Sequence, residues 1–220
     1  EDYESADDAG GNGVYDVTIT IGDGTNTGST ITYAVTVTDA NDQTPTYASS
    51  DTTRDVAEGV TAVETVAITD SDTGDNNVCT KAGADAALFT CTVSATQYVL
   101  AFANAEDYES ADDAGGNGVY DVTITIGDGT NTGSTITYAV TVTDVNDQTP
   151  TFTGVDLTPS SAEMVTGAFE TYTIVDTDTV GTYTCTVAGA DNGDVTCSIS
   201  GSTVSLTFAA TTNFEAPADA

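Results

Sequence analysis

The stretch VYDVTITIGDGTNTGSTITYAVTVTD, residues 119–144, alternates apolar and polar side chains in two segments separated by the turn GDGTN. A period of two places alternate side chains on opposite faces of a half-buried β-strand. A Gly- and Asp-rich turn between two such segments predicts an antiparallel hairpin. Its predicted inward face consists of Tyr120, Val122, Ile124, Ile126, Ile136, Tyr138, Val140 and Val142.

This hairpin belongs to a long internal repeat. Residues 106–144 reproduce residues 1–39 without change, a shift of 106 − 1 = 105 residues, and a more divergent copy begins at Thr151. We therefore expect residues 1–45 to be the back part of one repeat, 46–150 a whole repeat and 151–220 the front part of the next. Repeats of this length can each bury a core, like beads on a string.

The fold class follows from the same alternation. It recurs at Tyr98, Leu100 and Phe102, and again at Val204, Leu206 and Phe208. Frequent Thr and Val, Gly/Asp turns and only 4 prolines favour antiparallel sheets. We predict an all-β protein of tandem Ig-like Greek-key β-sandwiches in a linear array, with about seven strands per repeat.

Charge limits the classes of partner. The chain has 35 acidic residues against Arg54 and Lys81, no histidine and a formal net charge of −33. Nucleic acid is excluded as a partner because phosphate binding needs clustered Lys or Arg. Such a surface repels itself, so we expect bound cations, which the charge alone leaves open as protons, salt, a basic partner or multivalent metal.

The four cysteines recur as Cys79 with Cys91 and Cys185 with Cys197, 12 residues apart each time. We favour one local disulfide per repeat, worth about 3 kcal/mol by loop entropy and typical of an oxidising, extracellular compartment. Reduced buried thiols are the alternative, and zinc lacks further ligands. No segment predicts a membrane helix or a signal peptide, so export signals are expected outside this sequence.

The junctions between copies carry the clearest motif. They read TVTDANDQTPTY at residues 36–47 and TVTDVNDQTPTF at 141–152, which resembles the DxNDxxP linker of cadherin repeats. An early glutamate, a DxD motif after a strand and the segment DYE, in place of the family's DRE, follow in the family's order. The wording is closer to bacterial cadherin-like repeats than to animal ones. NFE at 213–215 departs from the pattern, because Asn213 replaces an aspartate and weakens that site.

The resemblance implies about three calcium ions at each junction, held by oxygen ligands. At the first junction it implies Asp2, Glu4, Asn41, Asp42, Asp70, Asp72 and Asp128, with the carbonyls of Ala40 and Gln43. At the second it implies Glu58, Asp107, Glu109, Asn146, Asp147, Asp176 and Asp178, with the carbonyls of Val145 and Gln148. Glu163 and Glu215 hold the matching positions of the third copy.

Elementary chemistry supports the same residues. Calcium takes six to eight oxygen ligands, and these motifs cluster oxygens with almost no competing base. The alternation of Val66 and Ile68 continues into Asp70 and Asp72, so two carboxylates leave the strand on one side. The alternative is that these Asp and Asn residues only form turns and solvated loops.

The functional expectation is an extracellular structural or adhesive shaft, in which calcium turns a hinged string of repeats into a stiff rod. One alternative is a split subunit whose residues 1–45 complete another copy, polymerising head to tail by strand complementation. Another is a module that binds glycans or cell surfaces, although no exposed aromatic cluster is evident. An enzyme is disfavoured by the absence of histidine and the scarcity of lysine. Threonine-rich faces could carry O-linked sugars, and no Asn-x-Ser/Thr acceptor occurs.

Overall fold

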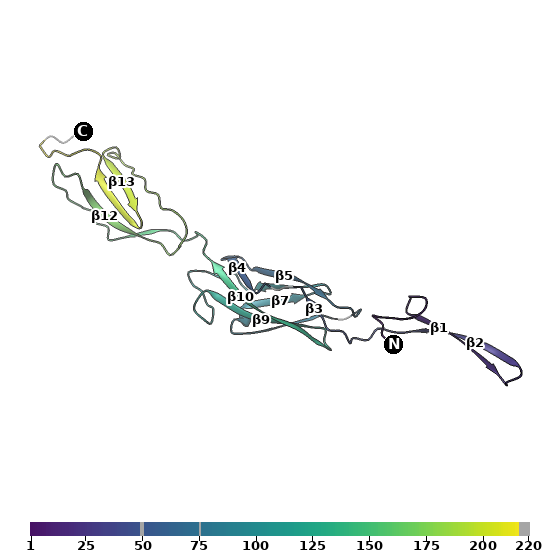
Figure 1. Ribbon diagram of the computed structural model, residues 1–220. Coiled ribbons are helices and arrows are strands. Elements are labelled where there is room, and N and C mark those ends of the chain that lie inside the picture. Colours follow the sequence, from purple (N-terminus) through teal and green to yellow (C-terminus); the bar gives the residue numbers. More distant parts are fainter. Residues whose placement is uncertain (49–50, 75, 216–220) are drawn as a thin grey trace. The chain divides into compact units, whose positions relative to one another are not determined.

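The computed structural model describes residues 1–48, 51–74 and 76–215, and nearly all of its regular structure is β-strand (Figure 1). It forms two compact units, residues 1–107 with 111–143 and residues 108–110 with 144–220. The domain boundaries expected from the repeat stay predictions. The last residues of the third copy, 216–220, lie outside the described part. No described helix is long and apolar enough to cross a membrane.

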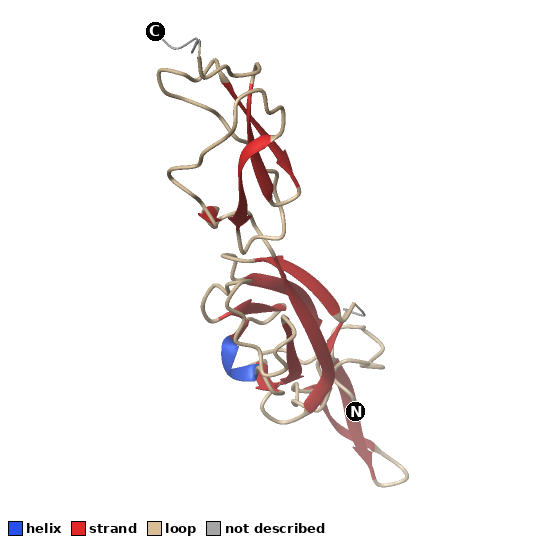
Figure 2. Cartoon of the chain, turned by 90° about the vertical axis from the view of Figure 1, so that its left-hand side faces the viewer, coloured by secondary structure: helices blue, strands red, loops and turns tan. Residues whose placement is uncertain are grey.

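Residues 46–143 form a sandwich of two four-stranded sheets. One sheet has the order β4-β10-β9-β6 and the other β3-β5-β8-β7. The strands are β3 (Thr46–Tyr47), β4 (Thr53–Ala57), β5 (Ala62–Thr69), β6 (Val78–Ala82), β7 (Phe89–Val93), β8 (Gln97–Phe102), β9 (Val119–Gly127) and β10 (Thr132–Thr143). A 3₁₀ turn, η1 (Ala86–Leu88), precedes β7 and is blue in Figure 2. Connections that cross between the sheets make this the predicted Greek-key sandwich.

The predicted inward face of β9 and β10 is the core of this sandwich. Tyr120, Val122 and Ile124 are each 0% exposed and pack against Tyr98, Leu100 and Phe102 of β8. The hydroxyls of Tyr98 and Tyr138 form a buried hydrogen bond of 2.6 Å between the two sheets. Burial of this many apolar side chains is the main stabilising contribution to such a fold.

The first copy of the hairpin has the same sequence but a different environment. β1 (Val14–Gly22) and β2 (Thr27–Thr36) pair antiparallel as a two-stranded sheet. Ile19 is 48% exposed, whereas its counterpart Ile124 is 0% exposed. Local sequence therefore sets the hairpin, and tertiary context sets its burial.

The second unit contains one sheet, in the order β11-β12-β14-β13. Its strands are β11 (Thr151–Thr153), β12 (Ala168–Val175), β13 (Val195–Ser200) and β14 (Thr203–Phe208). This order repeats that of β3-β5-β8-β7 in the sandwich. The counterparts of β4 and β6, residues 158–162 and 184–188, are not strands. In the sandwich, β4 pairs with β10 and β6 pairs with β9. The described part of the second unit has no strands at the positions of β9 and β10.

Both predicted disulfides are present, Cys79–Cys91 and Cys185–Cys197. The first joins β6 to β7, which are edge strands of opposite sheets. The second joins residue 185, outside any strand, to β13. Each disulfide therefore links the segment at the position of β6, residues 78–82 or 184–188, to an edge strand, β7 or β13.

Candidate metal centre

Strand ends deliver the carboxylates of the first cluster. β5 ends at Thr69, and the alternation that buries Val66 and Ile68 carries on to Asp70 and Asp72. Asp39 lies three residues beyond β2, which ends at Thr36, and Glu4 lies in the loop before β1. Carboxylate oxygens of Glu4, Asp39 and Asp72 all lie within 4.8 Å of one another.

Hydrogen bonds fix these carboxylates through one oxygen each. The N–H of Gln43 donates to Asp72 Oδ2 at 2.8 Å. The N–H of Thr73 donates to Asp39 Oδ2 at 2.6 Å, and its hydroxyl donates to the same atom. Asp70 Oδ1 accepts from the N–H of Asp72 at 3.3 Å. Each of these three side chains is thus oriented with its second oxygen left for another partner.

Four carboxylate oxygens here are buried and have no hydrogen-bond donor among the described residues: the second oxygens Asp39 Oδ1, Asp70 Oδ2 and Asp72 Oδ1, and also Glu4 Oε1. Burying anionic oxygens without a partner is costly, because they lose their hydration. Neither cation of the chain compensates, since Arg54 pairs with Asp51 and Glu64 and Lys81 donates to the carbonyl of Phe89. The described residues therefore place no compensating cation beside this cluster.

The pKa of Glu4 reflects the same lack of a compensating positive charge. Its own backbone N–H lowers the pKa, but burial and the carboxylates of Asp39 and Asp2 outweigh it and raise the pKa of Glu4 to about 7. Hydrogen bonds from the Thr73 hydroxyl and N–H hold the pKa of Asp39 below its ordinary value. Without a cation, the cluster favours a proton on Glu4.

The remaining residues predicted for the first junction lie around this cluster. Asp2 Oδ1 accepts from the N–H groups of Glu4 and Ser5 at 3.0 and 3.2 Å, so it shapes the loop that carries Glu4. Asp42 Oδ1 accepts from the Gln43 side chain at 2.8 Å. Ala40, whose carbonyl the resemblance implies as a ligand, is exposed.

Asp128 reaches the linker through a neighbour that the sequence reasoning missed. Asn131 Nδ2 donates to Asn41 Oδ1 and to the Gln43 carbonyl, both at 2.9 Å, and to Asp128 Oδ2 at 3.2 Å. Asp128 is only 4% exposed, and Oδ1 accepts from the N–H groups of Thr130 and Asn131 at 2.7 and 2.6 Å. Burial alone raises the pKa of Asp128, but these hydrogen bonds bring it below its ordinary value. Both oxygens of Asp128 are therefore engaged in holding the turn and the linker.

A second cluster lies inside the second unit, with Asp147, the counterpart of Asp42, in place of the counterpart of Asp39. Oxygens of Glu109, Asp147 and Asp178 lie within 4.8 Å of one another. The N–H of Gln148 donates to Asp178 Oδ2 at 2.9 Å, as Gln43 does to Asp72, and its side chain donates to Asp147 Oδ1 at 2.7 Å. Thr179 donates its N–H and hydroxyl to Asp144 Oδ2. Asp144 Oδ1 and Asp178 Oδ1 are buried without a hydrogen-bond donor among the described residues.

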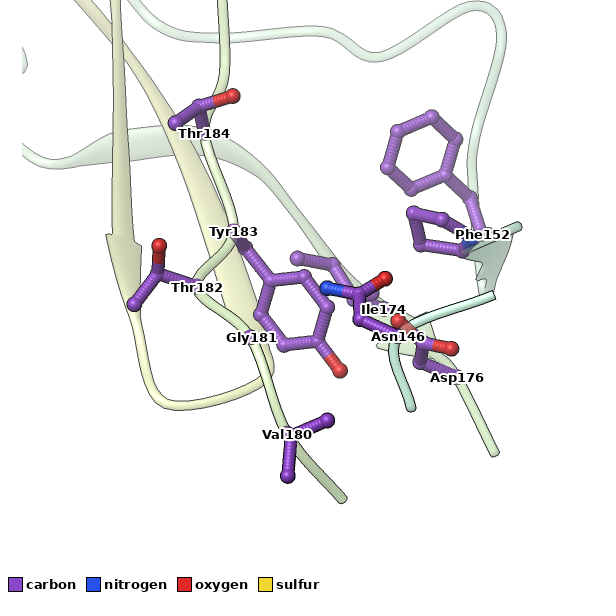
Figure 3. Close-up of a pocket in the computed structure, with 10 residues that line it drawn as sticks. Asn146, Phe152, Ile174, Asp176, Val180, Gly181, Thr182, Tyr183 and Thr184 are labelled. Atoms are coloured by element: carbon purple, nitrogen blue, oxygen red, sulfur yellow. The ribbon is translucent and has the colours of Figure 1, made fainter. Parts of the chain in front are cut away.

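Asn146 and Asp176 line a pocket of about 180 Å³ beside this cluster (Figure 3). The Tyr183 ring closes one side of it, and burial together with the charge of Asp176 raises the pKa of Tyr183. Gly181, at φ +112°, lies so close to Asn146 that a Cβ there would collide with the amide. Tyr183 and Gly181 were not among the predicted site residues, and no signal in the sequence marked them.

Three more residues were predicted as ligands at the second junction: Glu58, Asp107 and Val145. Glu58 is 8% exposed and directly follows β4, with its N–H donating to the Thr143 carbonyl at 3.0 Å. Asp107 is exposed and Val145 is 42% exposed. Their role as ligands stays a prediction.

The loop of residues 213–215 in the third copy keeps a hydrogen bond that the matching loop of residues 2–4 makes in the first copy. Glu163 Oε2 accepts from the N–H of Phe214 at 3.2 Å, and both Glu163 and Glu215 are exposed. Asn213 Oδ1 accepts from the N–H of Glu215 at 3.0 Å, as Asp2 does from Glu4. The neutral residue thus preserves the turn while removing a charge.

Other acidic residues have a purely structural role. Asp85 is 3% exposed, and its two oxygens accept from the N–H groups of Ala114 and Asp121 at 2.7 and 2.8 Å. Asp113 accepts from Asn117 and Gly118, both at 3.0 Å. Their oxygens are satisfied by backbone donors, so the turn interpretation holds here. Unsatisfied oxygens distinguish the linker carboxylates from these.

Asp39 and Asp144 are the main residues missing from the predicted ligand set. Each is the first aspartate of the DxNDxxP linker, so the motif itself contained the signal. The donor set is carboxylate and carbonyl oxygen, without cysteine thiolate or histidine, which fits a hard cation such as calcium and not zinc.

Comparisons with known proteins agree with this architecture. The sequence matches no protein-family model and no curated protein. The structure is similar to protocadherin gamma B2 extracellular cadherin domains 1–5, with 20% identity, a TM-score of 0.52, and coverage of 93% of this chain and 40% of that one. It is also similar to protocadherin gamma C5 EC1–3 (16% identity, TM-score 0.54, 94% and 69% covered) and to human CDH23 EC21–23 (19%, 0.54, 92% and 66%).

The chain spans 40% and 51% of the first two protocadherin structures it matches. Those likenesses cover most of the chain, the order of one sheet recurs in both units, and each unit has a cluster of carboxylates at its linker. The chain therefore has the fold of tandem, disulfide-containing cadherin-like repeats.

Proposed function

We propose that this chain is part of an extracellular adhesive or structural shaft whose repeat junctions are stiffened by calcium. The observation that carries the proposal is the set of four buried carboxylate oxygens at the first linker that lack a hydrogen-bond donor among the described residues. A divalent cation bound to them supplies the missing positive charge. The formal net charge of −33 also favours bound cations, since such a surface repels itself.

The protein's own contribution is to hold the oxygens in place. Gln43 and Thr73 fasten the linker to the loop after β5 from both sides, at Asp72 and Asp39. Asn131 adds a contact from the β9–β10 turn to Asn41. Because the ligands come from both the linker and the sandwich, cation binding stabilises the arrangement in which these segments meet. Loss of the cation restores carboxylate repulsion there.

We propose a structural or binding role and not an enzymatic one. The clustered carboxylates lie at the linkers, and the sequence has no histidine for proton transfer. The disulfides fit an oxidising, extracellular compartment. No observation on the described residues favours a glycan site, so the adhesive target stays open to experiment.

Isothermal titration with calcium, joined to elemental analysis, tests the proposal. We expect several ions per chain, with two groups of sites. Asp72→Asn should remove the first group and leave the second, and Asp178→Asn should do the reverse. Asp55→Asn removes the same charge from an exposed position on β4 and should leave both groups intact. Equal calcium content in all four chains, or none in the unsubstituted chain, would refute the proposal.

A further inference from the structure

One amide nitrogen meets three oxygens of the first junction that were predicted as calcium ligands. Asn131 Nδ2 lies 2.9 Å from Asn41 Oδ1, 2.9 Å from the Gln43 carbonyl oxygen and 3.2 Å from Asp128 Oδ2. These oxygens come from two parts of the chain, the linker and the β9–β10 turn. An amide nitrogen carries only two hydrogens, so it cannot give each of the three oxygens a hydrogen of its own.

The turn itself positions this amide. The backbone N–H groups of Thr130 and Asn131 donate to Asp128 Oδ1 at 2.7 and 2.6 Å, which leaves Oδ2 to the Asn131 side chain. The same sequence forms the same turn in the first copy, where Asn26 Nδ2 donates to Asp23 Oδ2 at 3.2 Å. Asp23 Oδ1 likewise accepts from two backbone N–H groups. The position of the amide is therefore a property of the turn sequence GDGTN.

The linker also packs closely against the strand that follows this turn. Pro45 is fully buried, and a Cβ on Gly133 of β10 would lie 2.4 Å from the Pro45 carbonyl oxygen. Glycine, which has no Cβ, allows two backbone segments to approach this closely. Packing and the Asn131 amide thus both hold the linker to the turn, and both contacts are made by the protein's own atoms.

A cation and the amide cannot occupy this position together. Calcium binds oxygens at about 2.3–2.6 Å, whereas the amide nitrogen keeps the three oxygens 2.9–3.2 Å away. The amide is neutral, and Asp128 is only 4% exposed. Buried charges are normally paired with an opposite charge or bound to a metal. The position therefore suits a cation better than the amide once calcium is available.

We propose that the Asn131 side chain is a neutral substitute for a cation at the first linker. When calcium is scarce, it holds Asn41 and Gln43 to the β9–β10 turn, and calcium displaces it from the same three oxygens. The linker therefore keeps this attachment to the sandwich at low calcium, and the need to break it lowers the calcium affinity of that position. The inference rests on the proposed calcium role and adds how this junction responds when calcium is withdrawn.

Nuclear magnetic resonance of the unsubstituted chain observes the amide directly. In chelator, the side-chain NH₂ protons of Asn131 are hydrogen-bonded and should exchange slowly with solvent. Saturating calcium should speed their exchange by about 10-fold, the factor given by a hydrogen bond of ordinary net strength. Asn26 is the control, because its side chain bonds Asp23 of its own turn and should exchange equally in both conditions. Asn131 protons that exchange at the same rate with and without calcium would overturn the proposal.

Calcium titration of variants measures the competition. In the Asp178→Asn chain, which keeps only the first group of sites, Asn131→Ala should raise the affinity for one ion by about 10-fold, because no competing contact has to be broken. Asp128 stays oriented, since backbone N–H groups hold its Oδ1. Asn26→Ala removes the same group from the same turn sequence and should leave the affinity unchanged. A lower affinity in Asn131→Ala would show that the amide positions a ligand, and the competition would be refuted.

This inference and the proposed function fail in different ways. If the unsubstituted chain binds no calcium, the proposed function fails and the inference fails with it. If the chain binds calcium but Asn131→Ala binds it equally or more weakly, only the exchange of amide for cation is refuted. The exchange measurement uses the unsubstituted chain, so it remains decisive even if Asn131→Ala does not fold.

Discussion

Thr73 donates its backbone N–H and its hydroxyl to the same oxygen of Asp39, 34 residues earlier in the chain. Thr179 does the same to Asp144. In each case the threonine ties the first aspartate of the linker to the loop after the DxD motif. The other oxygen of that aspartate is buried and has no donor among the described residues. A residue outside the proposed ligand set thus orients the carboxylate of a proposed ligand.

Replacing Thr73 with valine should weaken calcium binding at the first linker by about 10-fold, because groups that orient a ligand contribute on that scale. Valine keeps the shape and removes the hydroxyl donor that lowers the pKa of Asp39. Titration calorimetry measures the affinity. Thr90→Val serves as the control, because its hydroxyl bonds only a strand carbonyl, that of Ala101. Equal affinities in the two variants would contradict the role given to Thr73.

Asp85 should behave in the opposite way to the linker carboxylates. Asp85→Ala removes the acceptors of the N–H groups of Ala114 and Asp121, which should cost about 1–3 kcal/mol of unfolding free energy. The number of calcium ions bound by the folded protein should not change. Urea unfolding and elemental analysis provide the two measurements. A variant that lost calcium but not stability would show that Asp85 had been misassigned.

Glu106→Gln should change how stability depends on pH. Burial, followed by the nearby Asp112 carboxylate, raises the pKa of Glu106 from 4.5 to about 7 in the folded protein. The stabilising contribution of its proton is therefore complete below the unfolded pKa and is lost as pH rises through about 7. Glutamine keeps the side chain neutral, so the variant should match the unsubstituted protein near pH 4 and exceed it by about 1 kcal/mol near pH 8.

Thermal unfolding in the presence of chelator measures this difference across the pH range. Glu1→Gln is the matched control, because Glu1 is exposed and is followed by the same sequence as Glu106. A gain of equal size at pH 4 and pH 8 would show that general charge repulsion, and not the Glu106 proton, is responsible.

The Cys79–Cys91 disulfide should contribute about 3 kcal/mol to the stability of the sandwich. It links the edges of both sheets at β6 and β7. Replacing both cysteines with alanine should lower the unfolding free energy of residues 46–143 by that amount. Replacing Cys185 and Cys197 should leave that transition unchanged, because they belong to the other unit. A shared loss would mean that the units unfold together.

Much of the fold could be predicted from the residues themselves. The two-residue alternation at Tyr120–Ile126 specified a strand and its inward face, because side-chain direction in a strand depends on local geometry alone. It could not specify that Ile19 would be exposed in an identical strand, because burial depends on what lies opposite. The eighth strand of the sandwich arises because the first strand is divided into β3 and β4, which join different sheets.

The candidate site was predictable where ligands share a motif. Asp72 was expected from the DxD pattern, and Asp39 could have been taken from the linker itself. Asn131 could not, because its contact with Asn41 spans 90 residues and depends on how the turn meets the linker. The separation of Asp85 from the ligand carboxylates also required the structure, since only the hydrogen bonds reveal that its oxygens are satisfied.

Small-angle X-ray scattering of the unsubstituted chain, with calcium and then with excess chelator, tests the central claim most directly. If calcium stiffens the junctions, its removal should broaden the distribution of interatomic distances and shorten the mean end-to-end dimension, and added calcium should restore both. Scattering that is identical in the two conditions, with no calcium found by elemental analysis, would contradict the account.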